Sequence, residues 1–269
     1  MTCSYIVVEQ KDGIGRITLN RPDILNPLCT DMLAQCREAL AGLRENGAAV
    51  IVLTGAGRAF CAGADLKFLE RMLQESEAGE DRRYEEMNGT LLEGHALIRD
   101  LRAFPGPVVS LVNGPAVGGG VGLALAADIV LAAKSAYFSL PFVPKLGLVP
   151  DLGGFAFIQN RIGVARAMGC ALLGDPLDAE TAADWGLIWR CVKDRHLEEA
   201  AAELAGRLSS LPKSAVVALK QMSAQALTDS LPAFLDCERM LQASLFAGSD
   251  AAEGLRAVIE KRRPDFRPA

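Results

Sequence analysis

The sequence predicts an α/β fold in which an α/β core is followed by a helical tail. Short apolar runs bounded by turn residues occur early in the chain. Alanine-rich stretches dominate from Gly163 onward, with turn signals at 174–176, 185–186 and 211–212. Half of the 269 residues are hydrophobic and 23% are charged, which suits one large domain or one domain with a small appendage.

The N-terminal residues predict a β-hairpin. Residues 5–9 and 14–19 alternate well enough between apolar and polar side chains to be strands, and the Lys-Asp-Gly sequence at 11–13 is a hairpin signal. The polar segment 20–23, which contains a proline, ends this pattern.

A helix and a buried strand are expected next. Thr30 or Asp31 is a candidate N-cap for a helix over residues 32–45, which ends at Asn-Gly and carries Leu33, Cys36, Leu40 and Leu43 on one face. The continuous apolar run 50–53 suits a buried strand of a mostly parallel sheet.

Two further helices are predicted in the middle of the chain. Residues 64–74 and 84–103 have helical patterns, and the second is closed by the Phe-Pro-Gly-Pro sequence at 104–107. The charged residues 75–83 between them are expected to form a loop.

The glycine-rich segment 113–122 is the most informative part of the chain. It lies between apolar runs at 108–112 and 129–132, which predict strands, and it leads into a buried helix from Leu123. Glycines let a substrate approach the backbone closely and leave N–H groups free to donate hydrogen bonds. Close packing of a helix against a sheet is the structural alternative, and the segment alone does not decide between the two.

Composition and charge argue against several classes of function. A formal net charge of −5 and a pI near 5.2 argue against a surface for nucleic acid or anionic membrane. No apolar run is long enough for a transmembrane helix, and residues 1–5 lack signal-peptide features. The seven cysteines, Cys3 included, are scattered and form no CxxC pair, so a reducing cytoplasm is expected. His95 and His196 have no ligand partner at a useful spacing, and no metal site is expected.

A second candidate segment surrounds Ala64. Small residues precede a predicted helix N-terminus there, where unpaired N–H groups favour an anion; the simpler interpretation is a tight turn with Asp65 stabilising the first helical turn. Cys61 is interpreted as a packed residue, because no histidine is placed to activate it. The Gly-Ala-Gly sequence at 55–57 lacks the third glycine and the helix of a dinucleotide site.

Asp151 is a third candidate, in the apolar and glycine-rich segment 147–154 before a helical run from Phe155. Aspartate is a good N-cap, and a carboxyl group in apolar surroundings is also a candidate general base with a raised pKa. The residues alone leave both interpretations open.

In this order, these segments resemble the enoyl-CoA hydratase/isomerase (crotonase) family over most of the chain. The resemblance rests on Ala-Gly-Ala-Asp-Leu at 62–66, on the glycine-rich segment, and on Ala-Ala-Asp-Ile-Val-Leu-Ala-Ala at 126–133. It implies a crotonase (ClpP-like) spiral of ββα units over residues 1–200. It also implies a C-terminal helical region, 201–269, that assembles homotrimers or dimers of trimers.

The resemblance implies an acyl-CoA thioester as substrate, with coenzyme A as part of that substrate and no other cofactor. The backbone N–H groups of Ala64 and Gly119 would form an oxyanion hole for the thioester enolate. Two residues would come from a neighbouring subunit, Phe246 and Lys261. The other coenzyme A contacts would be Ile24, Leu25, Ala62, Ala64, Asp65 and Leu66.

At two positions this chain departs from the family's hydratases, and both departures argue against a hydratase reaction. The hydratases use two glutamates to position and activate a water. The first position is Gly122 in this chain, and the second is Phe142, or Val143 under a different placement of the loop. Adding water needs a base for the water and an acid for the α-carbon, so the sequence argues against efficient hydration.

The segment ending in Asp151 resembles the family's isomerases instead, closest to the enoyl and ring-epoxide isomerases of phenylacetyl-CoA breakdown. A 1,3-proton shift needs one carboxylate. Asp151 would remove a proton from one carbon and return it to another, while the N–H groups of Ala64 and Gly119 hold the enolate.

Two alternatives stay open. A hydratase or thioester hydrolase could take its acid from the segment 70–95, where Glu70, Glu85, Glu86 and Glu93 are candidates. An RNA-binding or scaffold protein of the same fold is the alternative from another class, against which the acidic balance argues. The acyl pocket would be shaped by apolar residues that could equally be core: Leu69, Met72, Met87, Leu91, Phe142 and Phe155.

Overall fold

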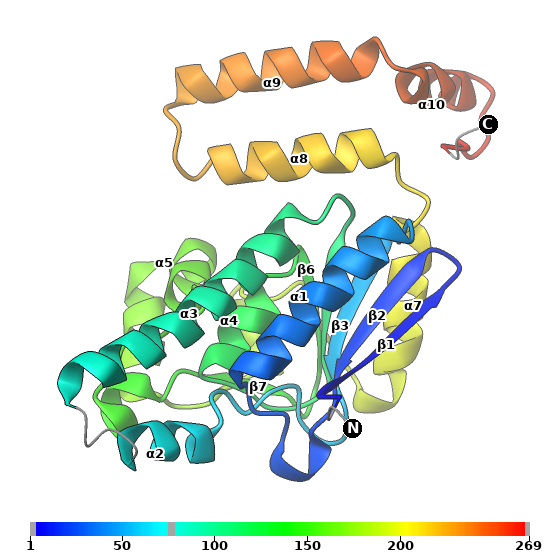
Figure 1. Cartoon of the computed structure of the whole chain (residues 1–269). Coiled ribbons are helices and arrows are strands. Elements are labelled where there is room, and N and C mark those ends of the chain that lie inside the picture. Colours follow the sequence, from blue (N-terminus) through cyan, green and yellow to red (C-terminus); the bar gives the residue numbers. More distant parts are fainter. Residues whose placement is uncertain (1–3, 75–78, 267–269) are drawn as a thin grey trace.

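The computed structural model describes residues 4–74 and 79–266 and has an α/β body from which helices extend at one end (Figure 1). The strands of the main sheet are β1 (Ile6–Lys11), β2 (Ile14–Leu19), β3 (Val50–Gly55), β4 (Val108–Val112), β6 (Ile129–Ala133) and β9 (Arg190–Val192). A smaller sheet contains β5 (Ala116–Val117), β7 (Tyr137–Ser139) and β8 (Leu177–Asp178). Within the described residues, the main sheet therefore has six strands in the order β1-β2-β3-β4-β6-β9.

The main sheet is parallel except at its first strand. β1 and β2 form the predicted antiparallel hairpin, and β2, β3, β4, β6 and β9 then pair in parallel. Every residue of β3 and β4 is buried, as expected for strands covered on both faces. The strands predicted at 50–53, 108–112 and 129–132 are confirmed.

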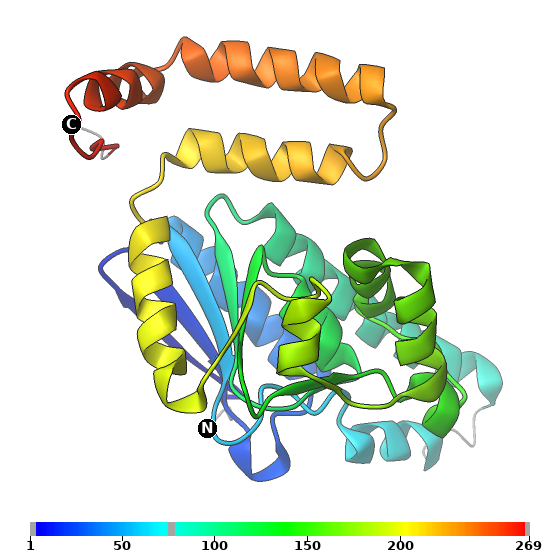
Figure 2. The same ribbon diagram turned by 180° about the vertical axis from the view of Figure 1, so that it is seen from behind.

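Helices cover both faces of this sheet. On one side lie α1 (Thr30–Glu45) and α3 (Glu80–Ala103), which pack against each other (Figure 1). On the other side, α7 (Leu197–Leu208) packs on β3, β4 and β6 and is the yellow helix in front of the sheet in Figure 2. The apolar face predicted for α1 is confirmed, since Leu33, Cys36, Leu40 and Leu43 are buried.

The starts of α1 and α3 differ from the predictions. α1 begins at Thr30 with Cys29 at its N-cap and no side-chain capping bond, so neither Thr30 nor Asp31 caps the helix. α3 begins at Glu80, one turn earlier than predicted, which makes the loop prediction wrong for residues 80–83. Residues 75–78 of that predicted loop, like Cys3, lie outside the described residues.

The helix predicted from Ala64 begins two residues later, as α2 (Leu66–Gln74). Asp65 precedes it, and its Oδ1 accepts the N–H groups of Lys67 at 3.1 Å and Phe68 at 3.4 Å, which is the geometry of an N-cap. Ala64 therefore lies in extended chain before the helix.

Two helices begin earlier than the sequence suggested. α4 (Gly119–Leu125) starts within the glycine-rich segment instead of at Leu123, and α5 (Gly154–Leu173) starts directly after Gly153. α6 (Ala179–Asp184) completes the body. The strands β8 and β9 were missed in the part predicted to be mainly helical, because two or three residues carry no readable periodicity.

The C-terminal helices α8 (Lys213–Gln225), α9 (Leu231–Phe246) and α10 (Ser249–Ile259) extend away from the body (Figures 1 and 2). α8 is held to the body by Lys220, whose Nζ donates to Asp128 Oδ2 at 2.8 Å. The predicted division between residues 200 and 201 falls within α7, and as a domain boundary it stays a prediction. None of the helices in the described part of the chain has the length and hydrophobicity to cross a membrane.

Candidate active site

The segments that carry Ala64 and Gly119 lie side by side. Cys61 and Ala116 form a parallel β-bridge, and the N–H of Val117 donates to the Cys61 carbonyl at 2.9 Å. Two residues further along, a Cβ atom on Gly63 would lie 3.5 Å from Gly118 Cα. Ala64 and Gly119 directly follow these residues, and a Cβ atom on Gly119 would lie 3.4 Å from Cδ1 of Leu28, the residue that forms a β-bridge with Ala64.

The β-bridge of Ala64 sets the direction of its backbone N–H. Ala64 bridges Leu28, whose N–H donates to the Gly63 carbonyl at 2.7 Å and whose carbonyl accepts the N–H of Asp65 at 2.9 Å. Backbone groups of successive extended residues point to opposite sides, so the Ala64 N–H points away from Leu28.

Gly119 opens α4, which makes its N–H group a candidate for the second donor. The first N–H groups of a helix have no partner within the helix and carry the positive end of its dipole. Two adjacent donors of this kind can hold one negatively charged oxygen. The segments that carry the two predicted residues therefore lie close together, and their role as an oxyanion hole stays a prediction.

Asp151 lies next to these donors. Its Oδ1 is 3.0 Å from the position that a Cβ atom would occupy on Gly119. This oxygen is buried and has no hydrogen-bond partner among the described residues. The N-cap of α5 is Gly153, and no side chain caps that helix, so the N-cap interpretation of Asp151 is wrong.

Burial raises the pKa of Asp151 to about 6, and a hydrogen bond with its own backbone opposes this shift. The ionised carboxylate is disfavoured because it has lost its water without gaining a cation. A carboxyl group with a pKa near the working pH is suited to general acid–base catalysis.

Of the two positions where the resemblance places a hydratase glutamate, one has no room for a longer side chain and the other carries an apolar residue. A Cβ atom on Gly122 would lie 2.5 Å from the backbone oxygen of Leu152 and 2.9 Å from its Cβ, so no longer side chain fits there. Phe142, in the single π-helical turn η2 (Phe142–Leu146), is buried with its ring against Gly118, and Val143 is partly exposed. Neither position offers an acid.

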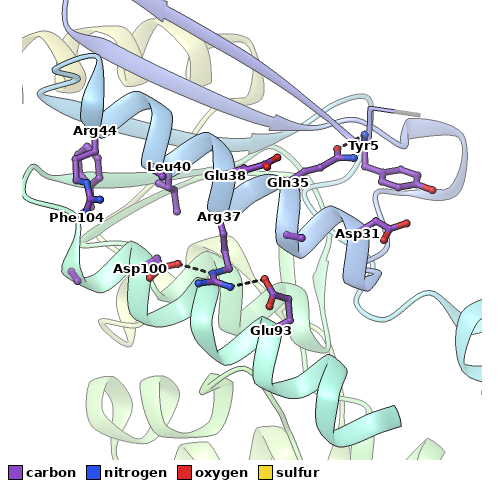
Figure 3. A pocket seen from close by; sticks show the side chains of 13 residues that line it. Tyr5, Asp31, Gln35, Arg37, Glu38, Leu40, Arg44, Glu93, Asp100 and Phe104 are labelled. Carbon is purple, nitrogen blue, oxygen red and sulfur yellow. Dashed lines mark hydrogen bonds and ion pairs between the residues drawn. The ribbon is translucent and has the colours of Figure 1, made fainter. Parts of the chain in front are cut away.

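The alternative acids on α2 and α3 have other surroundings. Glu93 lies in a surface pocket of about 800 Å³ between α1 and α3, where Arg37 donates to it at 2.8 Å and to Asp100 at 2.7 Å (Figure 3). Glu86 pairs with Arg82, and Glu70 and Glu85 are exposed. None of the four is buried and unpaired as the Asp151 oxygen is.

Cys61 is a packed residue, as predicted. Burial raises the pKa of its thiol to about 12, which leaves it protonated and unreactive at neutral pH. His95 is exposed and His196 pairs with Glu199. Among the described residues, no three His, Cys, Asp or Glu side chains are grouped as metal ligands.

Most of the predicted coenzyme A contacts lie together at one end of the sheet. The N–H of Ala62 donates to the Leu25 carbonyl at 2.9 Å, which joins the segment 24–25 to the segment 62–66. Ile24 and Leu66 present apolar side chains to solvent, with 49% and 67% of their surface exposed. The side chain of Asp65 is occupied, because it caps α2 and pairs with Arg21 at 2.7 Å.

Phe246 and Lys261 are not brought to this site by the same chain. Phe246 ends α9 and Lys261 follows α10, and these two helices lie at the opposite end of the molecule from α2 (Figure 1). Phe246 is 74% exposed. Their predicted role in binding coenzyme A therefore requires a second subunit.

Asn26 was missed in the sequence and organises the approach to Ala64. It is fully buried with a φ of 55°, and its Nδ2 donates to the carbonyls of Ala56 and Ala59 at 2.9 Å. Its Oδ1 accepts the N–H of Arg21 at 2.8 Å. The available signal was an asparagine directly before a proline, a turn signature in which asparagine tolerates the left-handed conformation.

Known proteins resemble this chain over nearly its whole length. The enoyl-CoA hydratase/isomerase family matches residues 9–268. The 1,2-epoxyphenylacetyl-CoA isomerase of Escherichia coli K12 is 40% identical, over 97% of this chain and 98% of that protein. A Rhodobacter capsulatus protein named "Probable enoyl-CoA hydratase" is also 40% identical, over 99% of both chains. The crystal structure of an enoyl-CoA hydratase from Bacillus anthracis superposes with a TM-score of 0.87 at 32% identity, over 98% of this chain and 99% of that one.

Proposed function

The chain belongs to the enoyl-CoA hydratase/isomerase family and has its crotonase fold, and within that family we propose that it is an acyl-CoA isomerase with Asp151 as its acid–base residue. The names of similar proteins include both isomerases and hydratases, so the choice between them rests on the site. The observation that supports it is the Asp151 Oδ1 atom, buried and without a hydrogen-bond partner beside Gly119, combined with the absence of an acid at Gly122 and Phe142.

The proposed reaction is a proton shift through a thioester enolate. The substrate carbonyl accepts hydrogen bonds from the N–H groups of Ala64 and Gly119. Asp151 takes a proton from the α-carbon of a 3-enoyl-CoA, and the electron pair of that C–H bond moves into the thioester. Asp151 then returns the proton to the γ-carbon, so that the double bond becomes conjugated and no net oxidation occurs. Each oxyanion donor stabilises such a transition state by about 3 kcal/mol.

Metal and redox cofactors have no step in this proposed reaction, and coenzyme A takes part as a portion of the substrate. We propose that it lies along Ile24, Leu25, Ala62 and Leu66. A homotrimer or dimer of trimers would bring Phe246 and Lys261 of a neighbouring subunit to this surface. Large exposed apolar residues on the C-terminal helices support such an assembly: Leu219, Leu231, Leu235, Met240, Leu255, Val258 and Ile259.

The acidic net charge of −5 supports a protein without nucleic-acid or anionic-membrane partners. The scattered cysteines, which form no CxxC pair, support our proposal that it acts in a reducing cytoplasm. The RNA-binding alternative would require a basic surface to neutralise phosphates.

Product analysis tests the proposed activity. Incubation with a panel of 3-enoyl-CoA thioesters is expected to give the conjugated 2-enoyl-CoA isomers, resolved by liquid chromatography and mass spectrometry. The same protein incubated with 2-enoyl-CoA thioesters is expected to give little 3-hydroxyacyl-CoA and little free coenzyme A. Formation of either as the main product would overturn the isomerase proposal and favour a hydratase or a thioester hydrolase.

The proposed role of Asp151 predicts how the rate depends on pH. The base must be ionised to accept a proton, and burial raises the pKa of Asp151 to about 6. We therefore expect kcat/KM to increase with pH up to about 6, roughly tenfold per pH unit below that value, and then to level off. Initial rates over a series of buffers measure this profile. A rate that stays constant below pH 6 would contradict the assignment of Asp151 as the base.

A further inference from the structure

The residue after Asp151 has an unusual backbone conformation. The N–H of Gly154 donates to the Asp151 carbonyl at 2.8 Å, and the two residues between them, Leu152 and Gly153, have φ values of 48° and 73°. Positive φ at both central positions defines a type I′ turn, which strongly favours asparagine, aspartate or glycine. A leucine in this conformation is strained and persists only where its surroundings hold it.

The surroundings of Leu152 are glycines on two helices. The side chain is buried, with 4% of its surface exposed. A Cβ atom on Gly94 of α3 would overlap its Cδ2, one on Gly119 would lie 3.1 Å from its Cδ1, and one on Gly122 would lie 2.9 Å from its Cβ. The absence of side chains at Gly94, Gly119 and Gly122 therefore creates the socket that the leucine fills.

The same socket borders the reacting carboxyl group. Both Asp151 Oδ1 and Leu152 Cδ1 lie within about 3 Å of one point, the position of a Cβ atom on Gly119. One peptide unit joins the two residues, so the turn held by the buried leucine also sets the position of the Asp151 backbone, from which the carboxyl group extends. The leucine methyl group occupies space from which water could otherwise reach Asp151.

We propose that Leu152 is a positioning residue for Asp151, holding the carboxyl group beside the Gly119 donor and excluding water from it. This inference rests on the proposed function of Asp151. It explains why a strained leucine occupies a turn that glycine would adopt freely. It also predicts that the proton taken by Asp151 returns to the substrate without exchange, because a closed site prevents proton leakage.

Gly94 of α3, which contacts the Leu152 side chain, offers a direct experimental test. Gly94→Ala adds one methyl group that displaces the leucine side chain, and alanine also favours the helix α3, so the protein is expected to fold. Gly89→Ala is the matched control, because it lies on the same helix and a Cβ atom there meets nothing within 4 Å. Leu152→Ala and Leu152→Gly remove the side chain itself, and Leu152→Met restores a similar volume.

Each variant is assayed with a 3-enoyl-CoA in D2O, and mass spectrometry gives the deuterium content of the product. For Gly94→Ala, Leu152→Ala and Leu152→Gly we expect kcat to fall by on the order of 100-fold, with KM nearly unchanged because the proposed coenzyme A contacts lie elsewhere. We expect deuterium incorporation per turnover to increase, and the pH profile of kcat/KM to move to lower pH as water reaches Asp151. Gly89→Ala and Leu152→Met are expected to behave like the unmodified protein.

The inference is overturned if Gly94→Ala and the Leu152 variants keep the original kcat, exchange and pH profile, or if Gly89→Ala reproduces their changes. Asp151→Asn, assayed in parallel, distinguishes a failure of the proposed function from a failure of the positioning role alone. Undiminished turnover by Asp151→Asn overturns the proposed function itself. An inactive Asp151→Asn beside unaffected Gly94 and Leu152 variants overturns only the positioning role.

Discussion

Asp151→Asn is expected to reduce kcat/KM for the isomerisation of a 3-enoyl-CoA by about a thousandfold, within the range known for general acid–base groups. The amide keeps the size and shape of the carboxyl group but cannot accept the α-proton. The N–H groups of Ala64 and Gly119 remain in place, so binding of the acyl-CoA and a residual rate from the oxyanion hole should persist. Steady-state kinetics together with a binding isotherm for a non-reactive acyl-CoA separate the two effects.

This loss of activity should not come from a loss of stability. Burial raises the pKa of Asp151 to about 6 in the folded protein, against about 3.9 in an unfolded chain. Below the lower value the group is neutral in both states. Between the two values the unfolded chain ionises while the folded group stays neutral, so stability falls as the pH rises and levels off above the higher value. At about 1.4 kcal/mol per pKa unit, the ionised group costs about 3 kcal/mol at neutral pH, and Asp151→Asn removes this cost.

Thermal denaturation at pH 7 should accordingly show Asp151→Asn to be at least as stable as the unmodified protein. Asp175→Asn, in an exposed turn, is the matched control for both measurements and should change neither. A folded Asp151→Asn protein with full turnover would require another base.

The proximity of the segments that carry Ala64 and Gly119 was predictable because both segments can be recognised in sequence. Ala64 and Gly119 each follow a buried strand of a parallel sheet, and adjacent parallel strands deliver the segments after them to the same edge. The error at Ala64 concerned only the helix start. The N–H of Ala64 belongs to extended chain, whereas the sequence predicted that it would belong to a helix N-terminus.

Leu152 and Gly94 were not predictable for a physical reason. A glycine-rich sequence after Asp151 suggests a flexible backbone. Nothing in this sequence shows that Leu152 adopts a positive φ or that it packs against a helix about sixty residues earlier in the chain. Contacts of this kind depend on the packing of α3, α4 and α5 against one another. The sequence therefore indicates that Asp151 has an apolar setting, while only the structure identifies what makes it so.

Gly122→Glu, the substitution that would restore the first hydratase glutamate, is expected to yield neither a hydratase nor a stable protein. A Cβ atom at this position meets the backbone oxygen of Leu152 at 2.5 Å, and that oxygen belongs to the turn that orients Asp151. Overpacking of a core costs about 1–3 kcal/mol, and an unpaired buried carboxylate adds several more. Relieving the clash would displace Leu152, so the isomerase activity should be lost together with stability.

Urea denaturation and both activity assays measure this outcome, with two companion variants. Gly122→Ala isolates the steric part and should destabilise the protein with no buried charge. Gly206→Glu, on the exposed surface of α7 where a Cβ atom meets nothing within 4 Å, should leave stability and activity unchanged. A folded Gly122→Glu protein that adds water to a 2-enoyl-CoA would show that the turn at Leu152 can move enough to accommodate the glutamate side chain. The identity of residue 122 alone would then separate hydration from isomerisation in this chain. If the variant instead loses both stability and isomerase activity, the packing of Leu152 against α4 is what prevents hydratase activity in this chain. A single restored glutamate cannot change that packing.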